Sequence, residues 1–249
     1  MSRRKKIYLL IFLFILLFAI NYKWLNDFLE KEFSNEQNAV VLRIVDGDTI
    51  EIENKTIVRL FGINTPERGE KYYPEAKEFL EKEILNKSVF IEFFGKDKYY
   101  RELGVIFSAG NNFNARVIEE GFANPYILDN KKYEIIFREA WEKCIIDEKN
   151  LCEPSKDKCA SCIFLKELSM KKQEVVLLNN CGFSCNLTDW KIKDEGRKKF
   201  IFGKTILESG KEIKIIAEDF EQDYVWTATG DSLFLRDSEG KLVLWERVE

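Results

Sequence analysis

Acidic and amide side chains follow two apolar runs in the first half of the chain. Asp46 and Asp48 flank Gly47 in the stretch VDGDT, where glycine permits a bend and both carboxylates can face one side. Asn64 and Thr65 follow the run VRLFGI. Hard cations such as Ca²⁺ bind oxygens from carboxylates, amides, backbone carbonyls and water. We therefore expect Asp48, the side-chain oxygen of Asn64 and the backbone carbonyl of Thr65 to hold calcium, with water completing the shell.

Two arginines and a glutamate accompany these oxygen atoms. Arg59 and Arg101 carry guanidinium groups, whose planar forks suit the oxygens of a phosphate. Glu67 follows Pro66, which fixes its distance from the preceding threonine, and its free carboxylate can take a proton from water. Each signal has an ordinary interpretation, since DGDT is a common turn and a single arginine is usually solvated. Their order and spacing together favour phosphate chemistry.

Short strands and helices must position these residues. β-branched residues dominate five runs that approach the alternation of a half-buried strand. The predicted strands are 39–45, 49–53, 56–63, 88–94 and 101–107. Helices are predicted from Tyr73–Pro74, over 114–123 with Gly121 as the stop, and from Tyr133 to about Ile145. This order predicts a mainly β domain with helices, a five-stranded closed barrel of the oligonucleotide-binding (OB) type, over residues 39–145.

The second half of the chain has a different organisation. Residues 146–168 interrupt the periodicity with cysteines and Pro154, so we interpret them as a linker. Short strands separated by turns such as Asp194-Glu195-Gly196 then fill residues 169–249. Strands spaced in this way predict a C-terminal β-sandwich.

Length and charge bound the possible functions. The 249 residues are 45% apolar, which is enough for two modest domains with buried cores. The net charge is −4, and acids slightly outnumber bases in the predicted barrel. A large basic surface for gripping a polyanion at long range is therefore excluded, and any contact with nucleic acid must be local.

The N-terminus carries a targeting signal. The basic stretch MSRRKK precedes an apolar run over 7–20, and Tyr22 and Trp24 follow it. We interpret residues 1–24 as an uncleaved signal-anchor, with a signal peptide as the alternative and a buried helix of a soluble protein as the third. Residues 25–38 are expected to be a spacer. Either targeting interpretation exports the remainder of the chain, either anchored to the membrane and facing the exterior or secreted.

All six cysteines lie in the second half of the chain. An even number of cysteines in an exported chain predicts disulfides. The short spacing of Cys181 and Cys185 suggests a local bridge, which leaves a separate group of four: Cys144, Cys152, Cys159 and Cys162. The alternatives are an all-sulfur zinc site in that group, which needs no histidine, and free thiols.

Residues 39 to about 145 resemble the staphylococcal nuclease (thermonuclease) family. The resemblance rests on five blocks in order: VVLRIVDGDTIEI, VRLFGINTPE, YYPEA, DKYYREL and NARVIEEGFA. It implies a five-stranded barrel that hydrolyses phosphodiester bonds of DNA and RNA with Ca²⁺. It also implies that Asp48 and the Thr65 carbonyl bind calcium, that Arg59 and Arg101 hold the scissile phosphate, and that Glu67 is the general base.

The family pattern assigns further residues and shows one departure. Asp46 matches a carboxylate behind the metal ligands, and Tyr99 matches a tyrosine near a terminal phosphate of the nucleotide. Tyr126 is a candidate for contact with a base. Asn64 stands where the family has a second calcium-binding aspartate. The lost negative charge is expected to lower the affinity for calcium, so full activity would need the abundant calcium of an extracellular site.

Residues 170–249 resemble the lamin-tail domain, an immunoglobulin-like sandwich. The blocks that carry the resemblance are VVLLNNCGFSCNLTDWKIKDE, FIFGKTILESGKEIKI and SLFLRDSEGKLV. In that family the domain is an interaction module, which implies an unknown partner here, and Trp190 is expected in its core. Taken together, the sequence predicts an exported calcium-dependent nuclease. The alternatives are a catalytically weak or inactive protein that binds nucleic acid and a surface-interaction protein with a relic nuclease.

Overall fold

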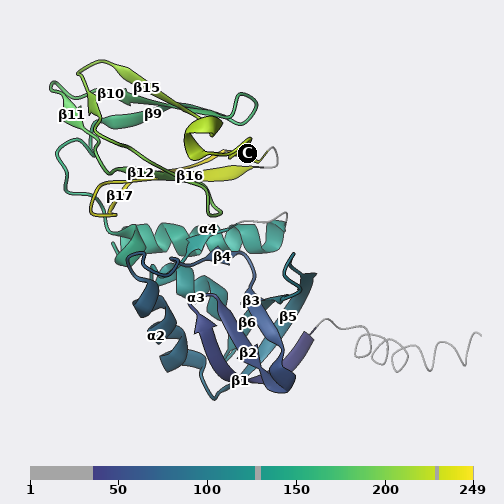
Figure 1. Ribbon diagram of the computed structural model, residues 1–249. Helices are drawn as coiled ribbons and strands as arrows, with labels where there is room; N and C mark the ends of the chain where they lie inside the picture. Colours follow the sequence, from purple (N-terminus) through teal and green to yellow (C-terminus); the bar gives the residue numbers. More distant parts are fainter. Residues whose placement is uncertain (1–35, 127–129, 228–229, 249) are drawn as a thin grey trace, which may run out of the picture. The chain divides into compact units, whose positions relative to one another are not determined.

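The computed structural model describes residues 36–126, 130–227 and 230–248 (Figure 1). Nearly all of these residues belong to one compact unit, Asn38–Glu249. The predicted anchor over 1–24 and most of the predicted spacer lie outside the described residues. Within the described ranges, no helix combines the length and apolar character needed to cross a membrane.

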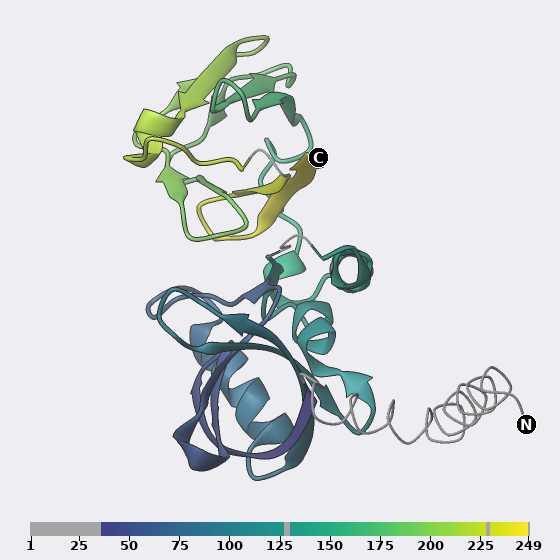
Figure 2. The same ribbon diagram turned by 90° about the vertical axis from the view of Figure 1, so that its right-hand side faces the viewer.

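The first half of the described chain is a closed five-stranded barrel. Its strands are β1 (Glu36–Asp46), β2 (Thr49–Ile52), β3 (Ile57–Leu60), β5 (Ser88–Lys96) and β6 (Glu102–Ser108). They follow the order β3-β2-β1-β5-β6, and parallel pairing of β3 with β6 closes the sheet. Figure 2 shows the strands curving into a ring. The predicted barrel is confirmed, although β1 begins at Glu36, inside the predicted spacer.

Small elements complete the barrel and carry its loops. They are the turns η1 (Glu53–Lys55) and η2 (Asn150–Cys152) and the short strands β4 (Ile63–Asn64), β7 (Asn111–Asn112) and β8 (Asn124–Pro125). β4 pairs with β8, so Asn64 lies opposite Asn124. This pairing fixes the loop that carries the predicted metal ligands against the end of the barrel.

Three helices pack on the barrel. They are α2 (Tyr73–Ile84), α3 (Phe113–Glu119) and α4 (Lys131–Ile146). α3 ends two residues before Gly121, which has a φ of +72°, and a Cβ there would lie 2.2 Å from the Lys149 carbonyl oxygen. Only glycine fits this turn. Trp141 on α4 is fully buried and contacts the ring of Phe234 with centroids 5.5 Å apart, so the last helix shares a core with the second half of the chain.

The second half of the described chain is built from short antiparallel strands. They are β9 (Ile163–Ser169), β10 (Glu174–Asn179), β11 (Cys185–Asn186), β12 (Lys191–Lys193), β13 (Lys199–Ile201), β14 (Ile206–Leu207), β15 (Glu212–Ile216), β16 (Asp231–Arg236) and β17 (Leu242–Val248), with the turn η3 (Ala217–Phe220). The sheets β15-β10-β9 and β13-β12-β16-β17 share one core, and β11 pairs with β14. Trp190 lies in that core, as predicted.

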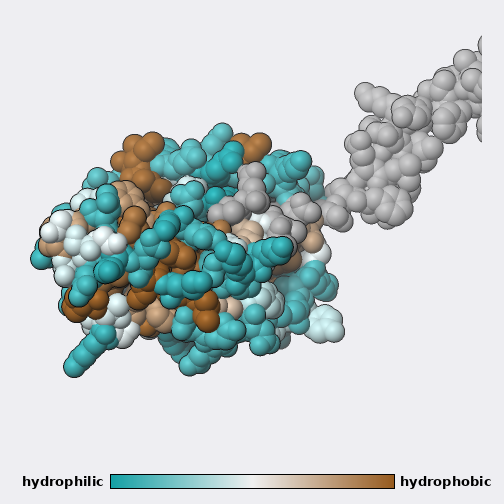
Figure 3. All heavy atoms as spheres, turned by 90° about the horizontal axis from the view of Figure 1, so that it is seen from above, coloured by the Kyte–Doolittle hydropathy of each residue, from teal (hydrophilic) through white to brown (hydrophobic). Residues whose placement is uncertain are grey.

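One boundary prediction is wrong. Residues 163–168, assigned to the linker, lie in β9, which pairs with β10 along its whole length. Ile163 and Leu165 alternate toward the shared core, but the cysteines just before them hide this pattern in the sequence. The outer face of this half is mixed. Seen from above, its brown apolar side chains are interrupted by hydrophilic ones (Figure 3).

The cysteines form three disulfides, but not in the predicted grouping. Cys144 pairs with Cys152, Cys159 with Cys185 and Cys162 with Cys181. The predicted disulfides are present, but the expected Cys181–Cys185 bridge is wrong, and the pairing also excludes the alternative of a zinc site on Cys144, Cys152, Cys159 and Cys162. The fold brings the 159–162 segment onto the 181–185 segment, where the sulfurs of Cys159, Cys181 and Cys185 lie within 4.8 Å of one another. Sequence spacing alone could not reveal this approach.

Candidate active site

Asp48 occupies the tight turn between β1 and β2 and is almost fully buried. Its Oδ1 accepts a hydrogen bond from Thr49 Oγ1 at 3.0 Å, and its Oδ2 accepts one from the Thr65 backbone N–H at 3.3 Å. Gly47 makes the turn possible, because a Cβ there would lie 2.9 Å from both Ala76 Cβ and Thr65 Oγ1. The turn thus brings two of the predicted metal ligands, Asp48 and Thr65, into direct contact.

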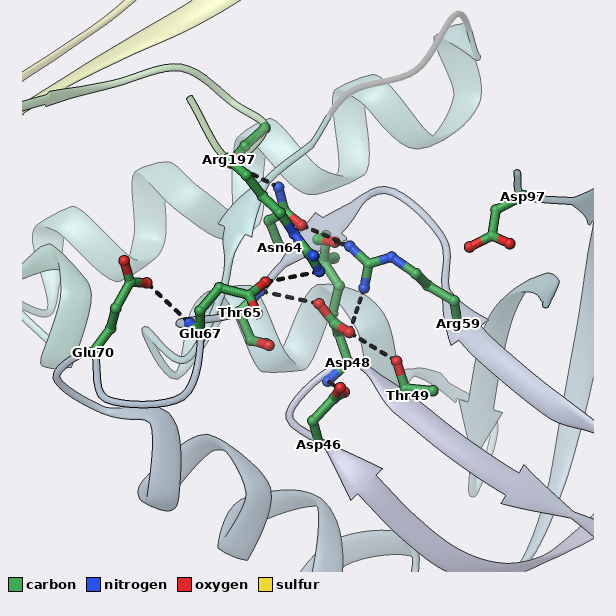
Figure 4. Close-up of polar contacts among 12 residues, drawn as sticks. Asp46, Asp48, Thr49, Arg59, Asn64, Thr65, Glu67, Glu70, Asp97 and Arg197 are labelled. Atoms are coloured by element: carbon green, nitrogen blue, oxygen red, sulfur yellow. Dashed lines mark hydrogen bonds and ion pairs between the residues drawn. The ribbon is translucent and has the colours of Figure 1, made fainter. Parts of the chain in front are cut away.

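Arg59 connects Asp48 to Asn64. It projects from β3, forms an ion pair with the Asp48 carboxylate and donates from Nη2 to Asn64 Oδ1 at 2.6 Å and to the Ile63 carbonyl at 3.1 Å (Figure 4). All three side chains are buried. A guanidinium with this many fixed acceptors is held in one orientation, which is a requirement for recognising a phosphate geometrically.

The pKa values of the two aspartates of the turn are shifted in opposite directions. Burial on its own would raise the pKa of Asp48, but the charge and hydrogen bond of Arg59 outweigh it and hold that pKa below its usual value. Burial and the neighbouring Asp48 charge raise the pKa of Asp46. Asp46 accepts a hydrogen bond from the Asp48 backbone N–H at 3.1 Å. Asp48 is therefore the carboxylate that stays ionised and can bind a cation. Asp46 holds the Asp48 backbone through the hydrogen bond from its N–H.

Arg101 reaches the same network from the loop before β6. Asp97 holds it, with 2.7 Å from Arg101 Nε to Asp97 Oδ2, and Arg101 Nη1 lies 3.5 Å from Thr49 Oγ1. Since Thr49 also donates to Asp48, one hydroxyl links the second arginine to the buried carboxylate. The Arg101 guanidinium lies over the ring of Tyr99, 5.4 Å from the ring centroid. The Tyr99 side chain is largely exposed. The parallel pairing of β3 and β6 thus gathers both predicted arginines at one end of the barrel.

Glu67 lies at the edge of this network, in the loop after Thr65. Its backbone N–H donates to Glu70 Oε2 at 2.9 Å, which fixes the loop. Its carboxylate forms an ion pair with Arg197 at 2.7 Å, and both side chains are about half exposed. Figure 4 shows Glu67 beside Thr65 and near Asn64 and Asp48. A half-exposed carboxylate is open to water, as a general base must be.

The second half of the chain contributes residues that sequence reasoning missed. Asn64 Nδ2 donates to the backbone carbonyls of Glu195 at 2.7 Å and of Gly196 at 3.1 Å. These residues and Arg197 belong to the hairpin between β12 and β13. The only sequence signal was Asp194-Glu195-Gly196, which predicted a turn and gave no indication that the turn meets a residue about 130 positions earlier.

A cleft of about 810 Å³ opens where this hairpin meets the barrel. Arg59, Asn64, Tyr99, Arg101 and Tyr126 line it from the barrel. Tyr126 is half-buried, and its backbone N–H donates to the Gly62 carbonyl at 2.9 Å. The structure therefore brings both predicted substrate tyrosines to the same opening as the arginines.

The donor atoms at the site suit calcium in chemical type. Asp48, Asn64 and Thr65 offer a carboxylate, an amide oxygen and a backbone carbonyl, which are all hard oxygen ligands. Arg59 keeps the pKa of Asp48 low, and Asp48 Oδ2 accepts a long hydrogen bond of 3.3 Å from the Thr65 backbone N–H. Asn64 Oδ1 is directed at Arg59 in this structure, so the amide would have to serve both the arginine and a cation.

Comparison with known proteins agrees with this geometry. The family described as staphylococcal nuclease homologue matches residues 57–152. The thermonuclease of Staphylococcus intermedius is 31% identical over 129 residues, which cover 47% of this chain and 77% of that protein. The chain belongs to the staphylococcal nuclease family. The thermonuclease of Staphylococcus hyicus is 29% identical over 130 residues, with the same coverage.

A third relative, matched over a shorter stretch, is named as an endonuclease. An uncharacterized endonuclease of Haemophilus influenzae is 35% identical over 98 residues, which cover 37% of this chain and 55% of that protein. The staphylococcal nuclease part of the predicted resemblance is confirmed, and these relatives support the hydrolase class. The family match ends at residue 152, and the lamin-tail resemblance stays a prediction.

Proposed function

We propose that the protein is a calcium-dependent endonuclease that hydrolyses phosphodiester bonds of DNA and RNA with little sequence specificity. The observation that carries the proposal is the single hydrogen-bonded network of Asp48, Arg59 and Asn64, joined to Arg101 through Thr49. Arg59, Asn64 and Arg101 of this network line one cleft, and Glu67 lies beside Thr65 in the loop that follows Asn64 (Figure 4). A site of this composition has a carboxylate for a cation, two guanidinium groups for a phosphate and a base for water.

Each group then has a defined role. Asp48, Asn64 and Thr65 would hold calcium, and the bound ion would supply positive charge to the phosphate oxygens. Glu67 takes a proton from the water that attacks phosphorus. Arg59 and Arg101 donate hydrogen bonds to the non-bridging oxygens, where negative charge grows in the transition state.

Preorganisation is the main contribution of the fold to this reaction. Arg59 is fixed by Asp48 and Asn64, and Arg101 is fixed by Asp97, before any substrate arrives. Donors that need not reorient stabilise a transition state more than mobile ones do. Because all these contacts are to phosphate, they position the strand without reading bases, and little sequence preference is expected.

We further propose that the enzyme works outside the cytoplasm, either anchored by residues 1–24 or secreted. The three disulfides support this location, because such bridges persist in oxidising compartments. We assign residues 169–249 to a lamin-tail-like, immunoglobulin-like sandwich with an unknown partner. Two sheets around one core, with Trp190 inside, support this assignment.

A protein that binds nucleic acid with weak or no catalysis is the second candidate. Two observations favour it: Arg197 occupies the Glu67 carboxylate, and an amide stands at position 64 with its oxygen directed at Arg59. Against it, a protein that only binds has no use for a half-exposed carboxylate beside the predicted metal ligand Thr65.

A cleavage assay separates the two candidates. The purified full chain is incubated with single-stranded DNA, duplex DNA and RNA, in calcium or in EDTA, alongside the Glu67→Gln and Arg101→Ala variants. The enzyme proposal predicts cleavage in calcium alone and loss of cleavage in both variants. Cleavage that both variants retain would place the activity elsewhere, and no cleavage by the native chain at saturating calcium would favour the binding protein.

A further inference from the structure

The hairpin between β12 and β13 forms the second wall of the cleft. Its residues 194–198 line the opening opposite Arg59 and Arg101, together with Tyr224 from the segment after η3. The hairpin is fixed from behind: Glu195 is almost fully buried, accepts a hydrogen bond from Ser232 Oγ at 2.7 Å and forms an ion pair with Arg247. It is fixed from the front by the Asn64 amide. Because the hairpin is bonded both to the C-terminal strands and to Asn64, it forms a fixed part of the site.

Acidic side chains in this wall are already satisfied within the protein. Asp194 Oδ1 accepts from the Lys198 backbone N–H at 2.9 Å, and Asp231 accepts from the backbone N–H groups of Glu195, Thr227 and Ser232. Burial raises the pKa of Asp194 to about 7, with a further contribution from the charge of Asp231. These acids therefore present less negative charge to a polyanion than their number suggests.

Basic and aromatic side chains of the wall line the same opening. Lys198 Nζ lies 3.7 Å from the ring centroid of Tyr224, whose side chain is 59% exposed. Arg197 is also largely exposed, and its one described partner is the Glu67 carboxylate. An exposed ion pair of this kind contributes little to stability, so a phosphate can replace the carboxylate.

We propose that the C-terminal domain supplies half of the nucleic-acid site: Arg197 contacts a phosphate next to the scissile one, and Tyr224, with Lys198 on its ring, stacks on a flanking base. Arg197 contacts Glu67, the proposed general base, directly. The Arg197 guanidinium is therefore expected close to the phosphate that reacts. Guanidinium groups recognise phosphate, and exposed aromatic rings beside cations are the usual platforms for bases. The cleft volume is in the range that encloses one small ligand, roughly 300 to 1,000 Å³.

The inference also explains asparagine at position 64. An aspartate would place a second carboxylate oxygen against two carbonyl oxygens, at the positions where Nδ2 now donates. The amide keeps its oxygen for Arg59 and uses its nitrogen to hold the second wall. Asn64 is on this account a positioning residue for the C-terminal part of the site.

Binding without cleavage tests the inference, which rests on the proposed function only for its description of the scissile phosphate. Fluorescence anisotropy of a labelled DNA oligonucleotide is measured with the full chain in EDTA, at several salt concentrations. Tyr224→Ala is expected to weaken binding about 5- to 150-fold, the range for loss of one stacked base. Arg197→Ala is expected to reduce the slope of log K against log salt by about 0.7, which corresponds to one phosphate contact.

Matched variants keep the test specific. Phe164→Ala and Lys204→Ala remove an exposed aromatic ring and an exposed cation from the same domain, away from the cleft, and should bind like the native chain. Tyr224→Phe keeps the ring and should retain affinity. Binding by the Tyr224→Ala and Arg197→Ala variants that matches these controls would overturn the inference, even if the chain proves to be a nuclease.

Cleavage rates distinguish a hairpin that binds the substrate from one that blocks Glu67. If the native chain cleaves, Arg197→Ala and Tyr224→Ala should both lower kcat/KM. A higher kcat/KM in Arg197→Ala would overturn the inference, because it would make the hairpin an inhibitor of Glu67. If the native chain does not cleave, the proposed function fails, and the anisotropy measurements still decide whether the C-terminal domain binds nucleic acid.

Discussion

Replacing Asn64 with aspartate tests the network at its most informative point. The change keeps the shape of the side chain and the oxygen that accepts from Arg59, but it removes both donors to the 194–198 hairpin. Two lost hydrogen bonds cost about 2 kcal/mol, and two buried carbonyls facing a carboxylate add about 1 kcal/mol or more. A stronger interaction with Arg59 returns about 1 kcal/mol. The net loss of unfolding free energy in the absence of calcium is about 2 kcal/mol.

Thermal unfolding followed by circular dichroism measures this loss. For a chain of this size, 2 kcal/mol lowers Tm by about 4 to 8 °C. Adding calcium should reduce the difference in Tm between the native chain and the variant. The new negative charge strengthens calcium binding, and a ligand that binds the folded state stabilises that state. The Asn64→Asp variant should also need less calcium for cleavage than the native chain.

A second buried asparagine provides the control. Asn114 donates from Nδ2 to the carbonyls of Phe61 at 2.9 Å and Gly104 at 3.1 Å, so Asn114→Asp removes the same pair of bonds inside the barrel. It should lower Tm with no recovery in calcium. An Asn64→Asp variant with the native Tm in EDTA would refute the contact with the hairpin, and an unchanged calcium requirement would remove Asn64 from the metal shell.

Three further predictions concern other parts of the molecule. Arg101→Ala should lower the cleavage rate on the order of 10²-fold with the fold intact, as the loss of one fixed donor does; a rate near that of the native chain would exclude Arg101 from the site. The folded-state pKa of Asp194 is about 7, above its ordinary 3.8, so the folded protein holds this proton more tightly than the unfolded chain and loses stability as pH rises from about 4 to 7. Asp194→Asn should therefore be more stable than the native chain at pH 8, by up to about 4 kcal/mol, and similar to it near pH 4; a difference that does not change with pH would contradict this. Peptide mapping without reductant should find Cys162 linked to Cys181, and replacing both with serine should cost about 3 kcal/mol of stability; a Cys181–Cys185 linkage would contradict the pairing.

Local patterns predicted the elements that position the site. The alternation of β-branched residues located the five barrel strands, and Tyr73–Pro74 located the start of α2. The residues expected to bind the metal and the phosphate were predicted from their chemical type and from the family blocks. Each of them lies at a strand end or in a turn, where the local sequence determines the shape of the backbone. Asp48 pairs directly with Arg59, and Thr49 links Asp48 to Arg101 through a longer contact of 3.5 Å.

Long-range approaches were not predictable from one sequence. Asn64 and the 194–198 hairpin meet only because β4 and β12 are brought together by the packing of α4 against the second half of the chain. The predicted pairing of the cysteines failed for the same reason, since Cys159 and Cys185 are 26 residues apart and meet only in the folded chain. The strand β9 was obscured by the cysteines that precede it.

The most direct test of the central claim is the single-turnover cleavage rate of a labelled oligonucleotide at saturating calcium, for the native chain and for Glu67→Gln. The account predicts that the variant binds the oligonucleotide at least as tightly as the native chain but cleaves it roughly 10²- to 10⁴-fold more slowly, because only the proton acceptor is lost. Equal cleavage rates would show that the cluster of Asp48, Arg59, Arg101 and Glu67 is not where the phosphodiester bond is hydrolysed.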